Sequence, residues 1–346
     1  MEREQIYNFS AGPSMLPTSV LHQIKEEILN YNGTGMSVME LSHRSVTFEH
    51  IIETTSNNLR KLLNIPSNYE ILFMQGGASA QFSAIPLNLC QQDDIVNYCV
   101  TGVWSSKAAD EAKKYANVKL VDKETWNMNP NATYLYYCDN ETINGVEFRE
   151  VPQTEIPLIC DMSSNFLSRK FDINRYAMIF AGAQKNFGIA GLTIVIIRND
   201  LLKRSARSYC PTILNYSLTH QNKSMYNTPP TFAIYISKLI TEWLLNQGGI
   251  EQVEQRNIEK ARMLYSTIDE SELFLNDVDT EYRSRMNVIF KLRDPSREKE
   301  FLERATKAGL YELAGHRSVG GFRASLYNAI PIEMVEKLCE FIRGFE

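Results

Sequence analysis

The sequence predicts an α/β fold: a large domain with a mostly parallel central sheet flanked by helices, and a smaller α/β domain at the carboxyl end. Three observations lead to this prediction. Apolar runs of strand length alternate with longer segments of helical periodicity. At 70–81 one such run passes directly into a glycine turn and a helix start. A glycine break at 247–249 precedes a second alternation. We therefore expect domains at 15–246 and 247–346, with segment 1–14 packing near the smaller one.

The individual elements follow from the same patterns in chain order. In the large domain we expect strands at 70–74, 95–100, 134–137, 158–161, 177–181 and 192–197, and helices from Pro17 onward and at 48–63, 107–115 and 232–245. The run at 192–197 is almost wholly β-branched, which favours a buried strand, either parallel or antiparallel. Beyond the glycine break we expect helices at 250–266 and 295–307, a strand at 287–292 and a last helix from Ile332.

Composition excludes several classes of function. The 346 residues are 44% apolar and 22% charged, as in an ordinary globular protein. A net charge of −5 argues against a general nucleic-acid or anionic-membrane partner. The six cysteines show no CxxC pairing, so they are expected to be free. HExxH, GxxxxGK[ST] and GxGxxG are absent, and no metal site is expected. No apolar signal core or run of about 18 apolar residues occurs, so we expect a cytoplasmic protein without a membrane partner.

Lys185 is the candidate catalytic residue. An amine acts as a covalent catalyst only when it loses its proton near neutral pH, which requires burial or a cationic neighbour. Lys185 follows one expected strand and Asp161 ends another, and reacting groups gather at the carboxyl ends of parallel strands. A lysine that forms a Schiff base and an aspartate facing a pyridinium nitrogen are what pyridoxal phosphate requires of a protein. Considered alone, such a lysine is more often a solvated loop residue and such an aspartate a helix cap.

Three phrases of the sequence carry more information than isolated residues. They are AGAQKN around Lys185, NET at 140–142 followed by Gly145, and GHRSVGGFRAS at 315–325. With these phrases the chain resembles the phosphoserine aminotransferases, class-V aminotransferases with the fold-type I architecture of pyridoxal phosphate enzymes. The resemblance extends from Asn8 to the last helix. The resemblance implies the fold-type I architecture and pyridoxal 5'-phosphate as the cofactor. The stretch 116–126 is shorter than in most members, so a trimmed surface loop is expected there.

The resemblance also implies roles for particular residues. Lys185 and Asp161 are the implied catalytic pair. The implied cofactor-binding residues are Ala78, Ser79, Trp104, Thr142, Asp161, Gln184, Lys185, Asn227 and Thr228. Backbone amides of Ala78 and Ser79 would bind the phosphate, and Trp104 would stack on the ring. Asn227 and Thr228 would reach the partner subunit's cofactor, which implies a homodimer. The implied substrate-binding residues are His43, Arg44, His316, Arg317 and Arg323, with the guanidinium fork of Arg323 clamping the α-carboxylate.

The implied reaction is reversible transamination between L-glutamate and 3-phosphohydroxypyruvate, giving 2-oxoglutarate and O-phospho-L-serine in serine biosynthesis. Considered alone, His43 and Arg44 are more often a surface pair, and only the resemblance favours a pocket. Two alternatives stay open. One is another fold-type I activity, a lyase or a different transaminase, that uses the same lysine and aspartate. The other is a catalytically silent relative that binds the cofactor or a protein partner.

Overall fold

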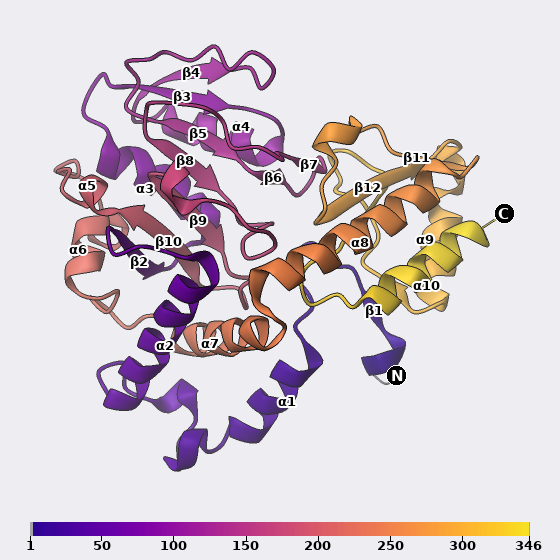
Figure 1. Cartoon of the computed structure of the whole chain (residues 1–346), viewed down its shortest axis with the longest axis horizontal. Coiled ribbons are helices and arrows are strands. Elements are labelled where there is room, and N and C mark those ends of the chain that lie inside the picture. Colours follow the sequence, from indigo (N-terminus) through magenta and orange to yellow (C-terminus); the bar gives the residue numbers. More distant parts are fainter. Residues whose placement is uncertain (1–2, 346) are drawn as a thin grey trace.

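A central sheet of seven strands organises the larger part of the molecule in the computed structural model, which describes residues 3–345 (Figure 1). In spatial order its strands are β2 (Tyr69–Met74), β10 (Thr193–Arg198), β9 (Met178–Gly182), β8 (Leu158–Asp161), β5 (Leu135–Cys138), β3 (Ile95–Cys99) and β4 (Asn117–Val121). Only β10 runs antiparallel to its neighbours. The predicted α/β fold with a mostly parallel sheet is therefore confirmed.

Helices cover both faces of this sheet because both faces are apolar. The helices of this part are α1 (Thr18–Glu27), which packs on α7, and α2 (Val46–Leu63), α3 (Gly77–Leu89), α4 (Val103–Ala112), α5 (Asn199–Leu202), α6 (Tyr216–Gln221) and α7 (Thr231–Asn246). Alternate residues of a strand point to opposite faces. Ile179 and Ile194 accordingly share one core with α2 and α7, whereas Phe180 and Val195 share another with α3 and α4. Short 3-10 turns lie at Arg3–Gln5, Tyr31–Gly33, Val38–Glu40, Ile173–Arg175 and Thr212–Leu214.

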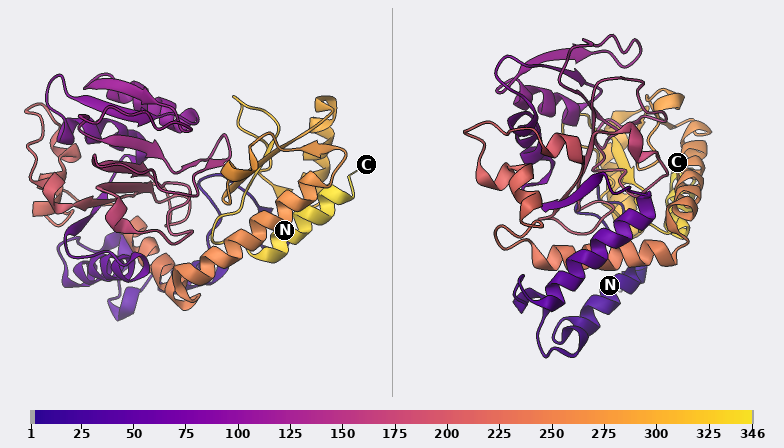
Figure 2. Two further views of the ribbon diagram at one scale, coloured as in Figure 1. Left: turned by 45° about the horizontal axis from the view of Figure 1, so that its top comes forward. Right: turned by 60° about the vertical axis from the view of Figure 1, so that its left-hand side comes forward.

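The carboxyl-terminal part has its own smaller sheet and its own core (Figure 2). Its elements are α8 (Gly249–Asp269), β11 (Phe274–Leu275), β12 (Asn287–Leu292), α9 (Glu298–Lys307), β13 (Leu310–Tyr311), β14 (Phe322–Ser325) and α10 (Ile332–Arg343), with 3-10 turns at Thr280–Tyr282 and Pro295–Arg297. Strand β1 (Tyr7–Asn8) pairs with β13, and Phe9 enters this core. We keep the division at 15–246 and 247–346 as a proposal, which the separate cores support.

Two local expectations were wrong. The stretch 116–126 is not simply a surface loop, because Asn117–Val121 forms β4, parallel to β3 at the sheet edge. Most of its side chains are exposed, so the strand carries little of the apolar signal that marks a buried one. Helix α4 begins at Val103 rather than at 107, which places Trp104 in its first turn. Groups distant in the sequence stabilise that early start, as described below.

The cysteines agree with the expectation that they are free. All six cysteines are free thiols, and all except Cys210 are buried. Among residues 3–345, none of the helices combines the length and apolar character needed to cross a bilayer.

Candidate active site

The predicted cofactor residues follow the carboxyl ends of parallel strands at one edge of the central sheet. Strands β2, β3, β5, β8 and β9 run in one direction, so their ends reach the same edge. The residues that follow them are Ala78 and Ser79 after β2, Trp104 after β3, Thr142 after β5, Asp161 at the end of β8, and Gln184 and Lys185 after β9. This edge is where open α/β sheets bind ligands.

Lys185 lies at the centre of these residues. Its Nζ donates a hydrogen bond to Thr142 Oγ1 at 2.5 Å and lies 5.9 Å from the centroid of the Trp104 ring. The residue keeps part of its surface open. Burial of the amine lowers the pKa of Lys185, and the positive charge of Arg323 adds to this effect, while the charge of Asp161 opposes it. A lysine with a lowered pKa has more of the neutral amine that acts as nucleophile and base.

The chain around Lys185 is held from both sides. The amide of Gly182 donates to Ser163 Oγ at 3.1 Å. From the amino-terminal segment, Ser14 donates through its amide to the Gln184 carbonyl at 2.9 Å and through its hydroxyl to the Lys185 carbonyl at 2.5 Å. Gly12 has φ +134°, and a Cβ placed there would lie 3.2 Å from Lys185 Cγ. Residues 12–14 therefore pack directly on the lysine.

Asp161 is a buried carboxylate that is only partly compensated. It is 3% exposed, and its Oδ1 accepts the Ser163 amide at 2.8 Å. Burial raises the pKa of Asp161, opposed by the Ser163 hydrogen bonds and by Lys185. Within the described part of the chain it forms no ion pair. A buried anion of this kind favours a cationic or hydrogen-bonding partner, which a protonated pyridine nitrogen provides.

Trp104 is positioned by a carboxylate that sequence reasoning did not select. Glu141 is fully buried, and its oxygens accept the amides of Trp104 at 3.0 Å and Ser105 at 2.7 Å. It therefore caps the positive end of α4. Asn144 Oδ1 accepts the Val103 amide at 3.1 Å. Glu141 is the middle residue of the NET motif, so the sequence did point to this segment. Its hydrogen-bond partners lie 36 and 37 residues away and could not be predicted from the sequence.

The amino terminus of α3 is available to an anion. Its N-cap, Gly76, has φ 92° and contributes no side-chain cap, so the first amides of the helix, including those of Ala78 and Ser79, lack the usual side-chain acceptor. Gln75 Nε2 donates to the Thr228 carbonyl at 3.3 Å. The exposed residues Asn227 and Thr228 thus lie beside the α3 start of their own chain.

Cationic side chains gather between α4 and the loop before β14. Arg323 is partly buried, and burial lowers the pKa of its guanidinium. Burial also lowers the pKa of His316, with further contributions from the charges of Arg323, Arg317 and Lys107. His316 Nδ1 accepts the Ser318 amide at 3.2 Å, so the neutral ring carries its proton on Nε2. Lys107, one turn after Trp104 with Nζ 4.7 Å from that ring, was missed. Lys107 follows Trp104 by one helical turn, and this spacing could have predicted that both side chains lie on the same face of a helix.

His43 and Arg44 are not joined to these groups in the single chain. They precede α2, whose N-cap is Ser45. No hydrogen bond or ion pair links either side chain to Lys185, Trp104 or Arg323 within residues 3–345. The Nε2 atom of His43 is buried without a hydrogen-bond partner. Contacts and electrostatic interactions therefore link Lys185 with Thr142, Trp104, Asp161 and Arg323, whereas the described residues show no such link for His43 and Arg44.

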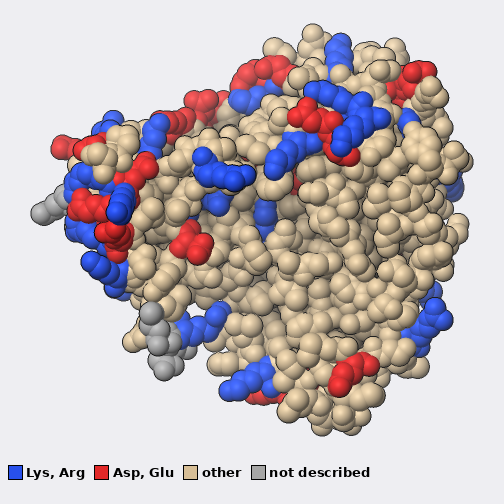
Figure 3. All heavy atoms as spheres, turned by 180° about the vertical axis from the view of Figure 1, so that it is seen from behind, with Lys and Arg blue, Asp and Glu red and all other residues tan. Residues whose placement is uncertain are grey.

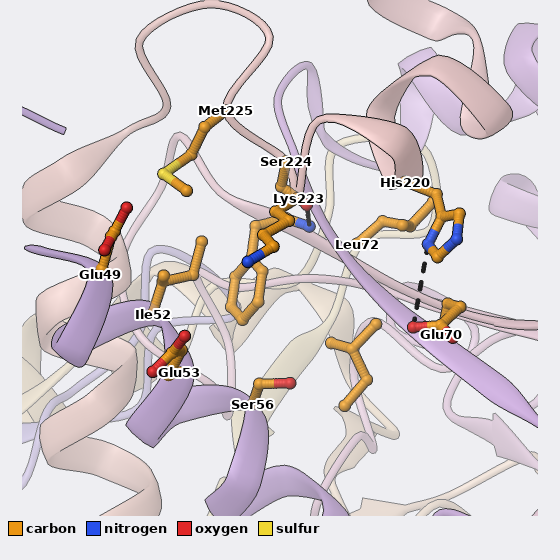
Figure 4. Close-up of a pocket in the computed structure, with 12 residues that line it drawn as sticks. Glu49, Ile52, Glu53, Ser56, Glu70, Leu72, His220, Lys223, Ser224 and Met225 are labelled. Carbon is orange, nitrogen blue, oxygen red and sulfur yellow. Dashed lines mark hydrogen bonds and ion pairs between the residues drawn. The ribbon is translucent and has the colours of Figure 1, made fainter. Parts of the chain in front are cut away.

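A separate cavity of about 300 Å³ lies between α2, β2 and the segment at 220–225 (Figure 4). Glu49 and Glu53 point into it from α2, and Lys223 faces them from the opposite wall. His220 Nδ1 lies 3.8 Å from Glu70 Oε2. None of the predicted site residues lines this cavity, so it is not part of the Lys185 group.

The fold and this site define a pyridoxal phosphate aminotransferase class, and comparison with known families agrees. The model of the class-V aminotransferases matches residues 6–338. The chain therefore belongs to the class-V aminotransferase family.

Within that family the chain is similar to phosphoserine aminotransferases. It is 49% identical to the enzyme of Bacillus cereus over 99% of both chains, and 51% identical to that of a Marinomonas species over 99% of this chain and 98% of the relative. The solved phosphoserine aminotransferase of Trichomonas vaginalis, described as bound to PLP, has a TM-score of 0.95 at 43% identity, covering 98% of this chain and 99% of that one. The enzyme of Bacillus circulans subsp. alkalophilus also gives 0.95 at 43%, covering 99% and 98%.

Proposed function

We propose that the chain is a phosphoserine aminotransferase that uses pyridoxal 5'-phosphate to interconvert L-glutamate and 3-phosphohydroxypyruvate with 2-oxoglutarate and O-phospho-L-serine. One observation carries the proposal. A lysine with a lowered pKa lies under the ring of Trp104, near the buried carboxylate of Asp161 and within the electrostatic influence of Arg323. The similarity to phosphoserine aminotransferases over nearly the whole chain supports the particular substrates.

The residues present fit the cofactor. The incompletely compensated Asp161 suits a pyridine nitrogen, Trp104 offers a ring face, and the amides at Ala78 and Ser79 suit the phosphate. Thr142 and Gln184 complete the proposed set beside Lys185. When bound, pyridoxal phosphate supplies an electron-accepting ring that no side chain provides.

Lys185 has two proposed tasks. Its neutral amine would hold the cofactor covalently, and as a free amine it would accept the proton from the substrate's Cα. Both tasks require an unprotonated Nζ, which the lowered pKa favours. Thr142 Oγ1 accepts the Nζ hydrogen bond and so orients the amine. The buried carboxylate of Asp161 would hold the pyridine nitrogen of the cofactor in its protonated form.

The proposed substrate site binds two different diacids in turn. Arg323 clamps the α-carboxylate shared by both acids. His43, Arg44, His316 and Arg317 serve the distal group, which is a carboxylate in glutamate and a phosphate in the other substrate. Both groups are anions, which the guanidinium groups and the ring N–H donors of the histidines can bind. A substrate without a distal anion leaves these donors unpaired, which is a strong basis for rejection.

We also propose a cytoplasmic homodimer in which Asn227 and Thr228 contribute to the partner subunit's cofactor site. Both residues are exposed in the single chain, and the apolar side chains of Ile213 and Tyr226 nearby are 49% and 53% exposed. Figure 3 shows a broad area of one face that carries few charged side chains, which suits a protein contact. No hydrogen bond or ion pair joins His43 or Arg44 to Lys185, Trp104 or Arg323 within residues 3–345, so we assign their proposed role to this dimer.

The direct test measures glutamate-dependent conversion of 3-phosphohydroxypyruvate by the purified protein. We expect turnover with the wild type and none with Lys185→Ala. The wild type should also show the visible absorbance of covalently attached pyridoxal phosphate, which Lys185→Ala should lack. Turnover of other amino-acid and keto-acid pairs, but not of this one, would replace the proposed substrates. Visible absorbance without any turnover would favour the alternative that the protein binds pyridoxal phosphate but is catalytically silent.

A further inference from the structure

Lys260 is a buried lysine far along the chain from the residues discussed so far. It lies in the middle of α8, whose many charged residues suggest a solvated helix. Its exposure is nevertheless only 2%. Lysine is almost never fully buried without partners, so the surroundings of its amine need an explanation.

The Lys260 amine binds a single loop at three points. Nζ donates to the carbonyls of Leu326 at 3.0 Å, Tyr327 at 2.9 Å and Ile330 at 3.0 Å. An ammonium group has three donors, whereas a neutral amine has two. Burial, together with the charge of Arg256, lowers the pKa of Lys260 to about 7. The three converging carbonyls are negative dipole ends that favour the charged form, because only that form satisfies all of them.

The loop at 326–330 also contacts the segment that contains Lys185. The Asn328 amide donates to Asn186 Oδ1 at 2.9 Å, and Asn328 Nδ2 donates to the Leu167 carbonyl at 2.9 Å. Asn257 of α8 donates to Asn328 Oδ1 at 2.9 Å. Asn186 is the residue after Lys185. Helix α8 therefore holds the loop through Lys260 and Asn257, and the loop in turn holds the chain next to the proposed catalytic lysine.

The same loop contacts the amino-terminal segment that packs on Lys185. Tyr327 donates through its hydroxyl to the Ala11 carbonyl at 2.7 Å, directly before Gly12. Just upstream of the loop, strand β14 carries Arg323. The Arg323 side chain forms no hydrogen bond or ion pair within the described chain, so its place depends on the backbone of β14 and of the loop that follows.

We propose that Lys260 is a positioning residue for the transamination: its amine, through three hydrogen bonds, holds the 326–330 loop in the conformation that places Arg323 and the Asn186 side of Lys185 relative to each other. The kinetic part of this inference rests on the proposed function, whereas the structural part does not. Lys260 itself touches neither of the two residues it positions. Its loss is expected to act on substrate affinity through Arg323 and on the lysine segment through Asn328.

The test compares Lys260→Met with a matched control in the full-length protein. Methionine keeps an apolar stem of similar length but offers no donor to the three carbonyls. The control is Arg60→Met, because Arg60 also binds two backbone carbonyls, Pro66 at 3.1 Å and Tyr69 at 2.8 Å, but in a part of the fold away from the 326–330 loop. Lys260→Gln, which keeps two donors, gives an intermediate case and replaces the methionine variant if that variant does not fold.

Two readouts are combined. Hydrogen exchange of the Asn328 amide reports on the loop without requiring activity, and we expect it to accelerate at least about tenfold in Lys260→Met. Steady-state kinetics should show KM for glutamate raised about tenfold or more, since small misplacements of a clamp are costly, with a smaller change in Lys260→Gln. The Arg60→Met control should leave both the Asn328 exchange rate and KM close to wild type.

The outcomes test the positioning role of Lys260 separately from the proposed aminotransferase function. Unchanged exchange at Asn328 overturns the inference, because the loop then does not depend on Lys260. Faster exchange with unchanged KM also overturns it, because Lys260 would then be structural only. An equal rise in KM in Arg60→Met would show a general effect of lost stability and counts against positioning. A wild type without activity on this substrate pair defeats the proposed function instead, and the exchange measurement still decides whether Lys260 holds the loop.

Discussion

At the scale of single residues, burial of Lys185 makes its amine more reactive but lowers the stability of the folded protein. Burial lowers the pKa of this lysine below its ordinary value, chiefly by desolvation. At a pH below that lowered pKa, the folded chain must hold a charged amine that water would solvate better. Above it the amine is neutral, ready to act as a nucleophile. A reactive lysine therefore reduces the stability of the cofactor-free protein.

The lowered pKa of Lys185 predicts how the free energy of unfolding depends on pH. Between the lowered pKa of the folded state and the ordinary value near 10.4, the unfolded chain binds more protons, so this residue makes stability rise with pH. We expect cofactor-free Lys185→Met to be more stable than wild type at neutral pH, with the difference shrinking toward pH 10. Urea unfolding at several pH values measures it. The exposed Lys203→Met is the control for loss of an amine, and a pH-independent difference for Lys185→Met would contradict the argument.

At the scale of elements, helix α4 depends on a carboxylate from another segment. Glu141 is fully buried and accepts two amides of the first helical turn, and its Oε1 also accepts the Ser105 hydroxyl at 2.6 Å. A Cβ at Gly102 would lie 2.6 Å from Glu141 Cδ, so only glycine permits this approach. The cap fixes the start of α4 and with it the ring of Trp104 near Lys185.

We expect Glu141→Gln to destabilise the protein by about 2 kcal/mol, because the amide nitrogen of glutamine faces donors where a carboxylate oxygen accepted them. Urea unfolding measures this loss, and Trp104 fluorescence should shift as the first turn of α4 loosens. Glu49→Gln is the matched control, since Glu49 is an exposed acidic residue in the first turn of α2 and should change stability by less than about 0.5 kcal/mol. Equal losses in both variants would refute the capping role.

At the scale of the whole molecule, an ionic network links strand β7 (Val146–Glu147) and the segments at Asp139 and Arg169 to Arg285, which lies just before the carboxyl-terminal strand β12. Arg285 binds Glu147 at 2.6 Å. Arg169 binds Asp139 at 2.6 Å, and its Nε lies 3.7 Å from Glu147. Burial alone would raise the pKa of Glu147, but the guanidinium groups around it lower the pKa overall. The network therefore ties the carboxyl-terminal part to the segments that follow β5.

The proposed homodimer gives a prediction at the same scale. If Asn227 and Thr228 complete the partner subunit's site, then Lys185→Ala and Asn227→Ala subunits are each inactive alone but restore part of the activity when mixed. A hybrid dimer then contains one site with both an intact lysine and an intact Asn227. Activity after subunit exchange measures this restoration. Verified exchange with no recovered activity would show that each chain completes its own site.

Much of this protein could be predicted from local patterns in its sequence. The strands β5, β8, β9 and β10 are short runs of apolar residues, and such runs form buried strands wherever they pack. Because parallel strands end at one edge, the order of strands and polar residues also predicted that Asp161 and Lys185 would meet. The cationic phrase at 315–325 indicated an anion site through residue type alone.

Only the tertiary structure decided which residues position these groups. Glu141, Lys107 and Lys260 are ordinary charged residues in the sequence, and nothing local distinguishes a solvated lysine from one enclosed by three carbonyls. The exposed edge strand β4 likewise depends on pairing with β3 rather than on its own apolar pattern. The lowered pKa of Lys185 has the same origin. Burial, capping and electrostatic shifts arise from contacts between segments far apart in the chain, whereas strands, turns and reactive residue types are properties of the segments themselves.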